Sequence, residues 1–475
     1  MSMLKTLFLN PPSYNGYDGG AGSRYQCTRE VKSFWYPTWL AQLAALVEGS
    51  RLIDAPARDL TLEEILPLSK TYEFLVIYTS TPSFPNDVKI AEAFKRENKN
   101  LIIGFCGAHV AVNPDQSILT SDAIDFVAGN EFDFTIKEIA EGNKLENIDG
   151  LTYKKNGKPV HNKPRSIIEN MDVLPWVTKV YKEHLVTTDY YNGYMLHPYM
   201  SFYTGRGCKS RCSFCLWPQT ISGHNYRTRS VENIIAEVIW ARDNFPEIKE
   251  FFFDDDTLTD NIPHAEALAR EIGKLGITWS CNAKANVPYE TLKIMKDNGL
   301  RLLLVGYESG NQKILVNIKK GIRIDIARQF TRDCHKLGIL IHGTFIIGLP
   351  GETSETIEET INYAQELNPK TIQVSLPAAY PGTLLYRQAT KNGWLIKNEN
   401  LVGNNGVQHS ILNYPHLSSK EIFEAVDNFY KRFYFRPKKM AILFFEMCGD
   451  WEIMKRRLRE GIEFFKFLFG RENPI

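Results

Sequence analysis

The sequence lacks long apolar runs, a surplus of one charge and the cysteine density of a disulfide-stabilised protein. Its 475 residues carry 56 Lys and Arg against 55 Asp and Glu, so no overall basic charge favours binding to nucleic acid. No apolar stretch reaches the roughly 18 residues of a membrane-spanning helix. The short apolar run at the start ends at Asn10-Pro11, unlike a secretory signal peptide. We therefore expect a cytoplasmic protein with no nucleic-acid partner.

The eight cysteines are too few for a disulfide scaffold in a chain of this length. Five are scattered, and we interpret them as structural thiols: Cys27, Cys106, Cys281, Cys334 and Cys448. The other three, Cys208, Cys212 and Cys215, lie within a stretch of eight residues. Such clustering in a chain without an export signal favours metal binding in a reducing compartment.

The length of the chain indicates two or three domains, because one hydrophobic core does not grow to this size. Within residues 1–145, short apolar runs alternate with amphipathic stretches and predict strands at residues 5–10, 50–54, 73–79, 100–106 and 124–128. This alternation is typical of an α/β fold with a doubly wound parallel sheet. Ligands of such sheets bind beyond the carboxyl ends of the strands. A hairpin is expected at residues 148–153 and 159–161, within a hairpin and linker region at residues 146–197.

A second alternation begins near Tyr199. It predicts strands at residues 200–204, 250–254, 278–282, 301–306, 340–347 and 371–376. Six βα units over residues 198–395 indicate a partial (β/α)6 barrel of the TIM type, with its site at the carboxyl ends of the strands. Five residues are candidates to face its interior: Cys281, Lys284, Tyr307, His342 and Gln373. Residues 396–475 are expected to form a helical, aromatic and basic C-terminal region.

The three clustered cysteines follow the first predicted barrel strand in the segment GRGCKSRCSFC, residues 205–215. Three thiolates bind three irons of a [4Fe–4S] cluster and leave the fourth iron open. S-adenosylmethionine (SAM) can bind there, and its reductive cleavage gives a radical that abstracts hydrogen from unactivated carbon. Phe214 is placed to shield the cluster and contact adenine. The alternative is a structural zinc site with His224 as the fourth ligand.

With these motifs the chain resembles the radical SAM superfamily, in the class with a cobalamin-binding domain. The resemblance implies a Rossmann-like cobalamin-binding domain ahead of the barrel. In FFFDDDTLT it implies that Asp254, Asp255 and Asp256 contact the SAM amino group. It also places Glu308 and Ser309 near the ribose, and Gly343 of GTFIIGLPGE near adenine.

For cobalamin the resemblance extends to the loops after the N-terminal strands. The segments GAHV and GNE resemble two loops of the family, although Ala108 stands where the family often has a second glycine. The candidate contacts are Asn10, Ser80, Thr81, Gly107, His109 and Gly129. The alternative is a degenerate domain that binds nothing.

Further segments, including the opening FLNPPSYNGYDGGAGSRYQ and SFWYPTW at residues 33–39, are similar to the hopanoid-biosynthesis-associated radical enzymes. This implies a hopanoid lipid substrate, contraction of a glucosaminyl headgroup of a bacteriohopanepolyol to a cyclitol ether, and a reductant such as a flavodoxin or ferredoxin. SFWYPTW and the aromatic residues of 190–203 are candidates to line a pocket for an amphiphile. The tail from Arg436 onward has nine Lys and Arg against six Asp and Glu, a composition compatible with peripheral contact at the inner membrane or with a helix packed on the barrel.

Two other functions are compatible with the same motifs. One is a cobalamin-dependent radical SAM methyltransferase acting on a carbon centre of a lipid or natural product. The other is a non-catalytic redox or cobalamin sensor. Product analysis separates the first from ring contraction, and the absence of 5′-deoxyadenosine would favour the sensor.

Overall fold

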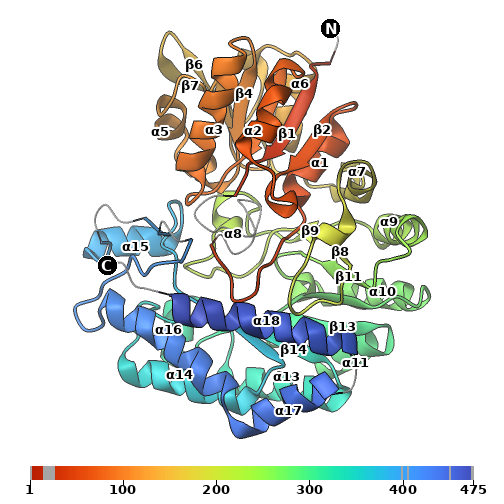
Figure 1. The fold of residues 1–475 in the computed structure, drawn as a ribbon, viewed down its shortest axis with the longest axis vertical. Coiled ribbons are helices and arrows are strands. Elements are labelled where there is room, and N and C mark those ends of the chain that lie inside the picture. Colours follow the sequence, from red (N-terminus) through yellow and green to blue (C-terminus); the bar gives the residue numbers. More distant parts are fainter. Residues whose placement is uncertain (1–2, 14–26, 397–399, 404–405, 449–450, 472–475) are drawn as a thin grey trace.

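The computed structural model describes residues 3–13, 27–396, 400–403, 406–448 and 451–471. Two α/β layers are stacked end to end, with the N-terminal layer above the barrel layer in Figure 1 and the C-terminal helices across the barrel. Part of the opening motif, residues 14–26, lies outside the described residues, as does the side chain of Cys448.

The N-terminal layer is the doubly wound sheet that the apolar runs predict. Its parallel strands have the order β2-β1-β3-β4-β5, and both faces are buried. Phe8 and Val76 belong to the core cluster on one face, whereas Leu7 and Leu75 belong to the cluster on the other. The strands are β1 (Thr6–Asn10), β2 (Arg51–Asp54), β3 (Phe74–Tyr78), β4 (Ile102–Cys106) and β5 (Phe126–Ala128). The helices are α1 (Thr38–Leu46), α2 (Leu62–Ile65), α3 (Phe84–Glu97), α4 (Ala108–Val112), α5 (Pro114–Leu119) and α6 (Asp133–Ala140).

The predicted hairpin is present, and it belongs to the N-terminal sheet. Strands β6 (Leu151–Lys155) and β7 (Lys158–His161) add to the sheet next to β5 in antiparallel orientation. Asn156 and Gly157 at the turn both have positive φ, 54° and 73°, as a two-residue hairpin turn of this hand requires. The sheet thus continues beyond residue 145, where we placed the end of the first domain.

The barrel layer contains the six predicted strands in sequential order, all parallel. No strand pairing joins β8 to β15 in the described structure, so the barrel is partial, as expected. The strands are β8 (Tyr199–Phe202), β11 (Glu250–Phe253), β12 (Trp279–Ala283), β13 (Leu300–Glu308), β14 (Leu340–Ile346) and β15 (Thr371–Ser375). The helices are α9 (Val231–Asn244), α10 (Ile262–Gly273), α11 (Tyr289–Asp297), α12 (Gln312–Asn317), α13 (Ile324–Leu337), α14 (Ser354–Leu367) and α15 (Leu384–Asn392).

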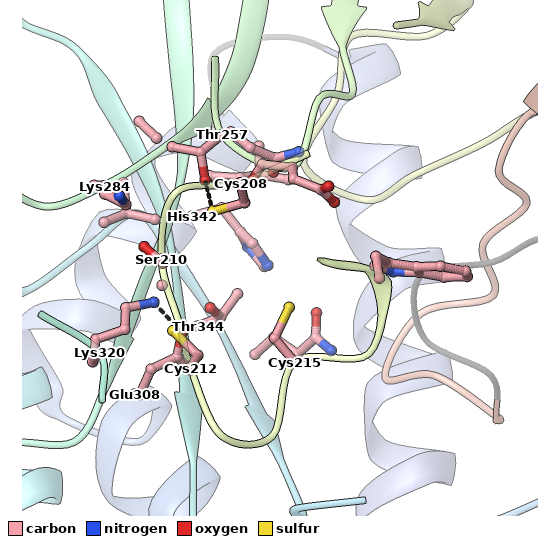
Figure 2. Close-up of a pocket in the computed structure, with 18 of the residues that line it drawn as sticks. Cys208, Ser210, Cys212, Cys215, Thr257, Lys284, Glu308, Lys320, His342 and Thr344 are labelled. Carbon is pink, nitrogen blue, oxygen red and sulfur yellow. Dashed lines mark hydrogen bonds and ion pairs between the residues drawn. The ribbon is translucent and has the colours of Figure 1, made fainter. Parts of the chain in front are cut away.

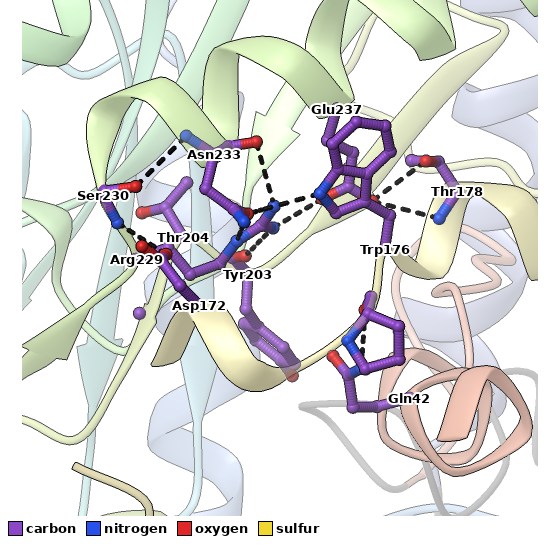
Figure 3. A network of polar contacts seen from close by, with 12 residues as sticks. Gln42, Asp172, Trp176, Thr178, Tyr203, Thr204, Arg229, Ser230, Asn233 and Glu237 are labelled. Atoms are coloured by element: carbon purple, nitrogen blue, oxygen red, sulfur yellow. Dashed lines mark hydrogen bonds and ion pairs between the residues drawn. The ribbon is translucent and has the colours of Figure 1, made fainter. Parts of the chain in front are cut away.

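A buried polar network fixes the connector between the layers to the barrel (Figure 3). The connector helix α7 (Val177–His184) packs against α9. At this contact the fully buried carboxylate of Glu237 accepts hydrogen bonds from the amide and hydroxyl of Thr178, at 3.1 and 2.9 Å, and pairs with Arg229. A buried carboxylate that is fully paired avoids the cost of desolvation without a partner. The network therefore holds the connector in one position.

Two buried ion pairs join the layers directly. The guanidinium of Arg206 donates two hydrogen bonds to Asp133, at 2.7 and 3.0 Å, and that of Arg227 donates two to Glu131, at 2.8 and 2.6 Å. Both carboxylates are fully buried. Because Glu131 and Asp133 follow β5 and both arginines flank the cysteine loop, these pairs bring the carboxyl ends of the N-terminal sheet against that loop.

The C-terminal region is helical only from residue 419, so the expectation of a helical region from residue 396 is wrong for residues 400–403 and 406–418. There the chain makes isolated bridges, such as Val402 with Gln408, and Gly406 lies in the turn between them with a φ of 76°. The helices that follow are α16 (Ser419–Tyr434), α17 (Pro437–Cys448) and α18 (Trp451–Gly470). Among the described helices, none combines the length and apolarity needed to cross a membrane.

Candidate functional site

The cysteine loop is closed at its base by a short β-ladder. Strand β9 (Gly205–Arg206) pairs with β10 (Arg227–Thr228), and helix α8 (Trp217–Thr220) lies between them. Gly207 has a φ of +92°, and a Cβ there would lie 2.3 Å from the carbonyl oxygen of Asn225. Only glycine fits this position, so the tight wrapping expected of the loop is present.

Gln219 clamps the loop from within. Its Nε2 lies 2.7 Å from the carbonyl oxygen of Cys215, 3.1 Å from that of Cys212 and 3.3 Å from that of Ser213. Its Oε1 accepts a hydrogen bond of 2.9 Å from the amide of Leu384. The side chain thus fixes the backbone that carries two of the three cysteines. The motif gave no indication of this role, because Gln219 lies outside the cysteine spacing.

Asp255 anchors the same loop to the end of β8. Its buried carboxylate accepts hydrogen bonds from the amides of Thr204, at 2.6 Å, and Gly205, at 3.1 Å, and from the hydroxyls of Thr204 and Tyr226. Burial raises the pKa of Asp255, whereas these hydrogen bonds act in the opposite direction. The implied contact between Asp255 and SAM has no support in this geometry, because the carboxylate faces the loop backbone.

The three thiols face one cavity of about 260 Å³ at the carboxyl ends of the barrel strands (Figure 2). Cys208, Cys212 and Cys215 lie on different sides of it. Phe214, Asp256 and Glu308 also line it, so three of the residues expected near SAM surround the cavity together with the thiols.

Glu308 reaches the cavity through an irregular strand end. The register between β13 and β14 shifts at Gly306 and Glu308, and Glu308 has a φ of 64°, a backbone conformation that costs a side-chain-bearing residue free energy. Its carboxylate lies 2.6 Å from Nζ of Lys320. A Cβ at Gly306 would lie 2.3 Å from Glu308 Oε1 and 2.7 Å from Nζ of Lys320, so glycine leaves room for the pair.

Burial raises the pKa of all three cysteine thiols. For Cys212 the nearby cation of Lys320 lowers the pKa in part. Thiols that burial keeps protonated become metal ligands when a cation stabilises the thiolates. The donor set therefore fits a soft, sulfur-bound metal group.

The alternative zinc site finds no support. Within the residues that the structure describes, no His, Asp or Glu side chain joins the three thiols to complete a four-ligand set for a single zinc ion. Nδ1 of His224 instead lies 3.2 Å from the carbonyl oxygen of Cys208. The thiols line a cavity rather than a tetrahedral site, and this geometry fits a larger group with the three cysteines at its edges.

The other predicted SAM residues lie away from the cavity wall. Asp254 accepts a 3.3 Å hydrogen bond from Asn282, and the buried hydroxyl of Ser309 contacts that of Thr360 at 3.2 Å. A Cβ at Gly343 would point at Pro369, 3.1 Å away. Side chains alternate along a strand, and it is the neighbours of Gly343 that line the cavity, namely His342 and Thr344.

Three of the five interior candidates line the cavity: Lys284, His342 and Gln373. Cys281 is buried in the main core, and Tyr307 turns outward to the hydroxyl of Thr331, 2.6 Å away on α13. Burial and the nearby Arg29 cation lower the pKa of His342 to about 3, so its imidazole is neutral near pH 7.

Segments from the N-terminal layer and the connector complete the cavity. Arg29, Trp35 and Tyr194 line it, and Arg29 reaches Gln373 on β15 with a hydrogen bond of 3.2 Å. This confirms for Trp35 and Tyr194 that the SFWYPTW segment and the aromatic residues 190–203 contribute to a pocket wall. Arg29 was missed, because no motif surrounds it in the sequence.

The predicted cobalamin residues lie where expected, after the N-terminal strands, but several are engaged with neighbours. Nδ2 of Asn10 donates to Asp54 at 2.6 Å. Ser80 contacts Ser83 at 3.0 Å, and Thr81 contacts Nδ1 of His109 at 3.2 Å. Burial lowers the pKa of His109 to about 4, so this ring is neutral near pH 7.

The two glycines of this group differ in their surroundings. Gly107 has a φ of +114°, and its Cβ would lie 2.3 Å from the carbonyl oxygen of Thr79. At Gly129 the nearest atom would be Cα of Ala111, 3.9 Å away, and its amide donates to the carbonyl oxygen of Gly150 at 3.0 Å. Gly107 is therefore required by the backbone itself, whereas a Cβ at Gly129 would make only ordinary van der Waals contacts.

A second cavity of about 400 Å³ adjoins the first, and its wall is mostly apolar. Arg29, Tyr194 and His342 line both cavities. Tyr194 and His342 stack with their ring centroids 4.0 Å apart, so they form a partition between the two spaces. The remaining wall comes largely from α16, α17 and α18.

Comparison with known proteins agrees with this site. The sequence model described as "Radical SAM superfamily" matches residues 202–364. A protein of Pyrococcus horikoshii named as an uncharacterized methyltransferase is 31% identical over 97% of this chain and 98% of its own. The cytidylyl-2-hydroxyethylphosphonate methyltransferase of Streptomyces wedmorensis is 30% identical over 49% of this chain and 45% of its own.

Two solved structures share the fold across nearly the whole chain. The radical SAM methyltransferase TsrM of Kitasatospora setae, with cobalamin and a [4Fe–4S] cluster bound, has a TM-score of 0.66 at 16% identity, over 92% of this chain and 83% of its own. The cobalamin-dependent radical enzyme OxsB, with aqua-cobalamin and SAM bound, has a TM-score of 0.69 at 15% identity, over 96% and 72%. The family model covers the cysteine loop at the carboxyl ends of the barrel strands, and one relative matches the chain almost end to end. The chain therefore belongs to the radical SAM superfamily.

Proposed function

We propose that this protein is a cobalamin-dependent radical SAM methyltransferase that acts on a carbon centre of an apolar substrate. The observation that carries the proposal is the convergence of Cys208, Cys212 and Cys215 on one cavity where the two α/β layers meet. The methyltransferase names of several relatives favour methyl transfer, and the fold shared with TsrM and OxsB supports a cobalamin-dependent radical enzyme.

Three groups of residues would hold the cofactors. The cysteines would bind a [4Fe–4S] cluster, which supplies the electron that cleaves SAM, while cobalamin supplies a carrier for the methyl group. Asp256, Glu308 and Phe214 line the same cavity as the thiols and would orient SAM. The loops after β3, β4 and β5, with Thr81, Gly107, His109 and Gly129, would face the corrin ring.

The remaining residues of the cavity would position the substrate and exclude water. Lys320 and Lys284 each pair with a carboxylate, Glu308 and Asp260, so their cations balance negative charge next to the thiolates. His342 is neutral near pH 7 and lies at the partition toward the apolar cavity. We expect a flavodoxin or ferredoxin as electron donor, and a cytoplasmic location because free thiols need a reducing compartment.

Product analysis tests the proposal. Protein reconstituted anaerobically with iron, sulfide and cobalamin would be incubated with reductant, methyl-deuterated SAM and lipid extract of a deletion strain. Methyl transfer predicts a product with a deuterated methyl group, formed together with S-adenosylhomocysteine. If neither that product nor 5′-deoxyadenosine forms with any extract, the proposal fails and a non-catalytic sensor becomes the better reading.

The second candidate is ring contraction of the glucosaminyl headgroup of a bacteriohopanepolyol, giving a cyclitol ether. The adjoining apolar cavity favours it, because a hopanoid has a large apolar body and a polar headgroup. This reaction adds no methyl group and consumes no SAM methyl. An unlabelled product of unchanged carbon count, without S-adenosylhomocysteine, would therefore select it over methyl transfer.

A further inference from the structure

The exposed apolar side chains of this protein are concentrated on one helical hairpin. Of the eighteen large apolar residues exposed in the described structure, ten lie between Phe435 and Phe469. Phe445, Phe469 and Trp451 are 72%, 69% and 62% exposed. In α18 the exposed positions 451, 458, 462, 465 and 469 are three, four or seven residues apart and so share one face. Single exposed apolar residues are ordinary, but a continuous patch marks a binding surface.

Basic residues flank this patch. Nine Lys and Arg stand against six Asp and Glu from Arg436 to the end of the chain, and Lys455, Arg459 and Lys466 are exposed on α18. An apolar face with aromatic and basic side chains matches an anionic bilayer surface. A second copy of the chain would instead place these cations against each other.

The apolar cavity lies directly behind the patch. Met440, Phe444 and Phe465 line that cavity and are also 53%, 61% and 48% exposed. They therefore stand where the cavity meets the outer surface. At its inner end the cavity shares Tyr194 and His342 with the thiol cavity. Figure 1 shows α18 running across the barrel.

We propose that the α17–α18 hairpin docks on an anionic lipid bilayer and that the apolar cavity receives the apolar part of a membrane lipid. The polar end of that lipid then extends past Tyr194 and His342 toward the thiol cavity. The substrate route rests on the proposed function, whereas the membrane contact does not depend on it.

Vesicle flotation tests the membrane contact. Reconstituted protein would be mixed with vesicles of phosphatidylcholine, with or without phosphatidylglycerol. The variant Phe445→Ser/Trp451→Ser/Phe469→Ser changes exposed residues that line neither cavity. Its partitioning should fall by about tenfold or more relative to wild type. The control Val316→Ser/Ile326→Ser changes exposed apolar residues on the barrel helices and should partition as wild type does.

Filling the cavity tests its occupant. Gly461 lines the apolar cavity, and no heavy atom lies within 4 Å of where its Cβ would be. Gly461→Leu therefore places its Cβ in open space on the cavity wall and improves helix propensity. It should weaken binding of the fluorescent fatty acid parinaric acid by about tenfold, with unchanged vesicle partitioning. Gly470→Leu, at the end of the same helix and with equal space, should bind as wild type does.

The same measurements on cluster-free Cys212→Ala protein separate the two proposals. Membrane and fatty-acid binding should persist there, so a failure of radical chemistry would leave this inference standing. Three results would overturn it: wild type that floats with neither vesicle, a triple variant that floats as well as wild type, or Gly461→Leu that binds parinaric acid normally. Dimerisation abolished by the triple substitution, in protein that ignores vesicles, would also overturn it by assigning the patch to a second copy.

Discussion

The two parallel sheets of this protein differ in what lies beyond their carboxyl ends. After the barrel strands, a loop carries three thiols around a cavity, and the charged groups of Glu308 and Lys320 face into it. After the N-terminal strands, polar side chains bond mainly to one another, as Asn10 does with Asp54. The barrel edge thus differs from the N-terminal edge in having an inserted loop that supplies metal-ligating thiols.

The first prediction concerns the cysteine loop at the barrel and has the largest expected effect. Cys212→Ala removes a ligand from the thiol cavity, so reconstituted protein should lose the brown absorbance of its cluster and release no 5′-deoxyadenosine from SAM. The matched control is Cys334→Ala, which removes a buried thiol on α13 and should keep both signals. Full cleavage activity in Cys212→Ala would refute the assignment of this cavity.

The second prediction concerns the contact between the two layers. Arg227→Met removes the guanidinium that donates two hydrogen bonds to the fully buried Glu131 carboxylate and leaves only Arg206, 3.9 Å away, which should lower the free energy of unfolding by about 3–5 kcal/mol. Chemical denaturation monitored by circular dichroism would measure the loss. Lys293→Met breaks an exposed ion pair with Asp297 and should change nothing measurable. Equal stability of the two variants would show that the pair does not hold the layers together.

The third prediction concerns the loops after the N-terminal strands and compares two of their glycines. Gly107→Ala forces a methyl group toward the Thr79 carbonyl at a φ of +114°, and it should cost about 1–3 kcal/mol in thermal or chemical unfolding of cobalamin-free protein. Gly129→Ala adds a methyl group at ordinary van der Waals distance from its neighbours and should keep wild-type stability. If Gly129→Ala nevertheless weakens cobalamin binding, measured by the shift of the corrin absorbance, the loop after β5 faces the cofactor. Unaltered binding would remove Gly129 from the site.

The smallest effect is a change in pH dependence. Burial raises the pKa of Asp87 to about 7 from 3.8, despite a 2.6 Å hydrogen bond from Thr79. Between these values the folded protein binds more protons at this group than the unfolded chain, so its contribution to stability falls as pH rises from about 4 to 7. Asp87→Asn should remove this contribution, reducing the slope of unfolding free energy against pH by up to about 1.4 kcal/mol per pH unit. An unchanged slope would mean that Asp87 ionises normally.

Most of the fold could be predicted because the parallel strands of both sheets are short apolar runs between amphipathic segments. The predicted strand at residues 371–376 became β15 (Thr371–Ser375), whereas the one predicted at residues 148–153 became β6 (Leu151–Lys155). The non-helical structure of residues 400–403 and 406–418, before α16, was not predicted. A composition averaged over the whole basic and aromatic tail hides the local effect of a glycine such as Gly406. The hairpin was found from Asn156-Gly157, but its attachment to β5 depends on long-range pairing.

The sequence predicted the part of the candidate site that depends on the spacing of the cysteine ligands. It did not predict the part that depends on the direction of each side chain. Cys208, Cys212 and Cys215 converge as expected, since three ligands in one loop are close in any conformation that wraps a metal group. Gly343 and Asp255 did not, because a strand alternates its faces and a turn can direct an acid inward.

The sequence alone determined the two α/β layers and the cysteine loop, because apolar periodicity and ligand spacing are local properties. Only the tertiary structure decided that Gln219 clamps the loop, that Arg206 and Arg227 join the layers, and that Tyr194 and His342 divide two cavities. Those contacts join residues far apart in the chain, and buried charge pairing and packing select them only after the layers have met.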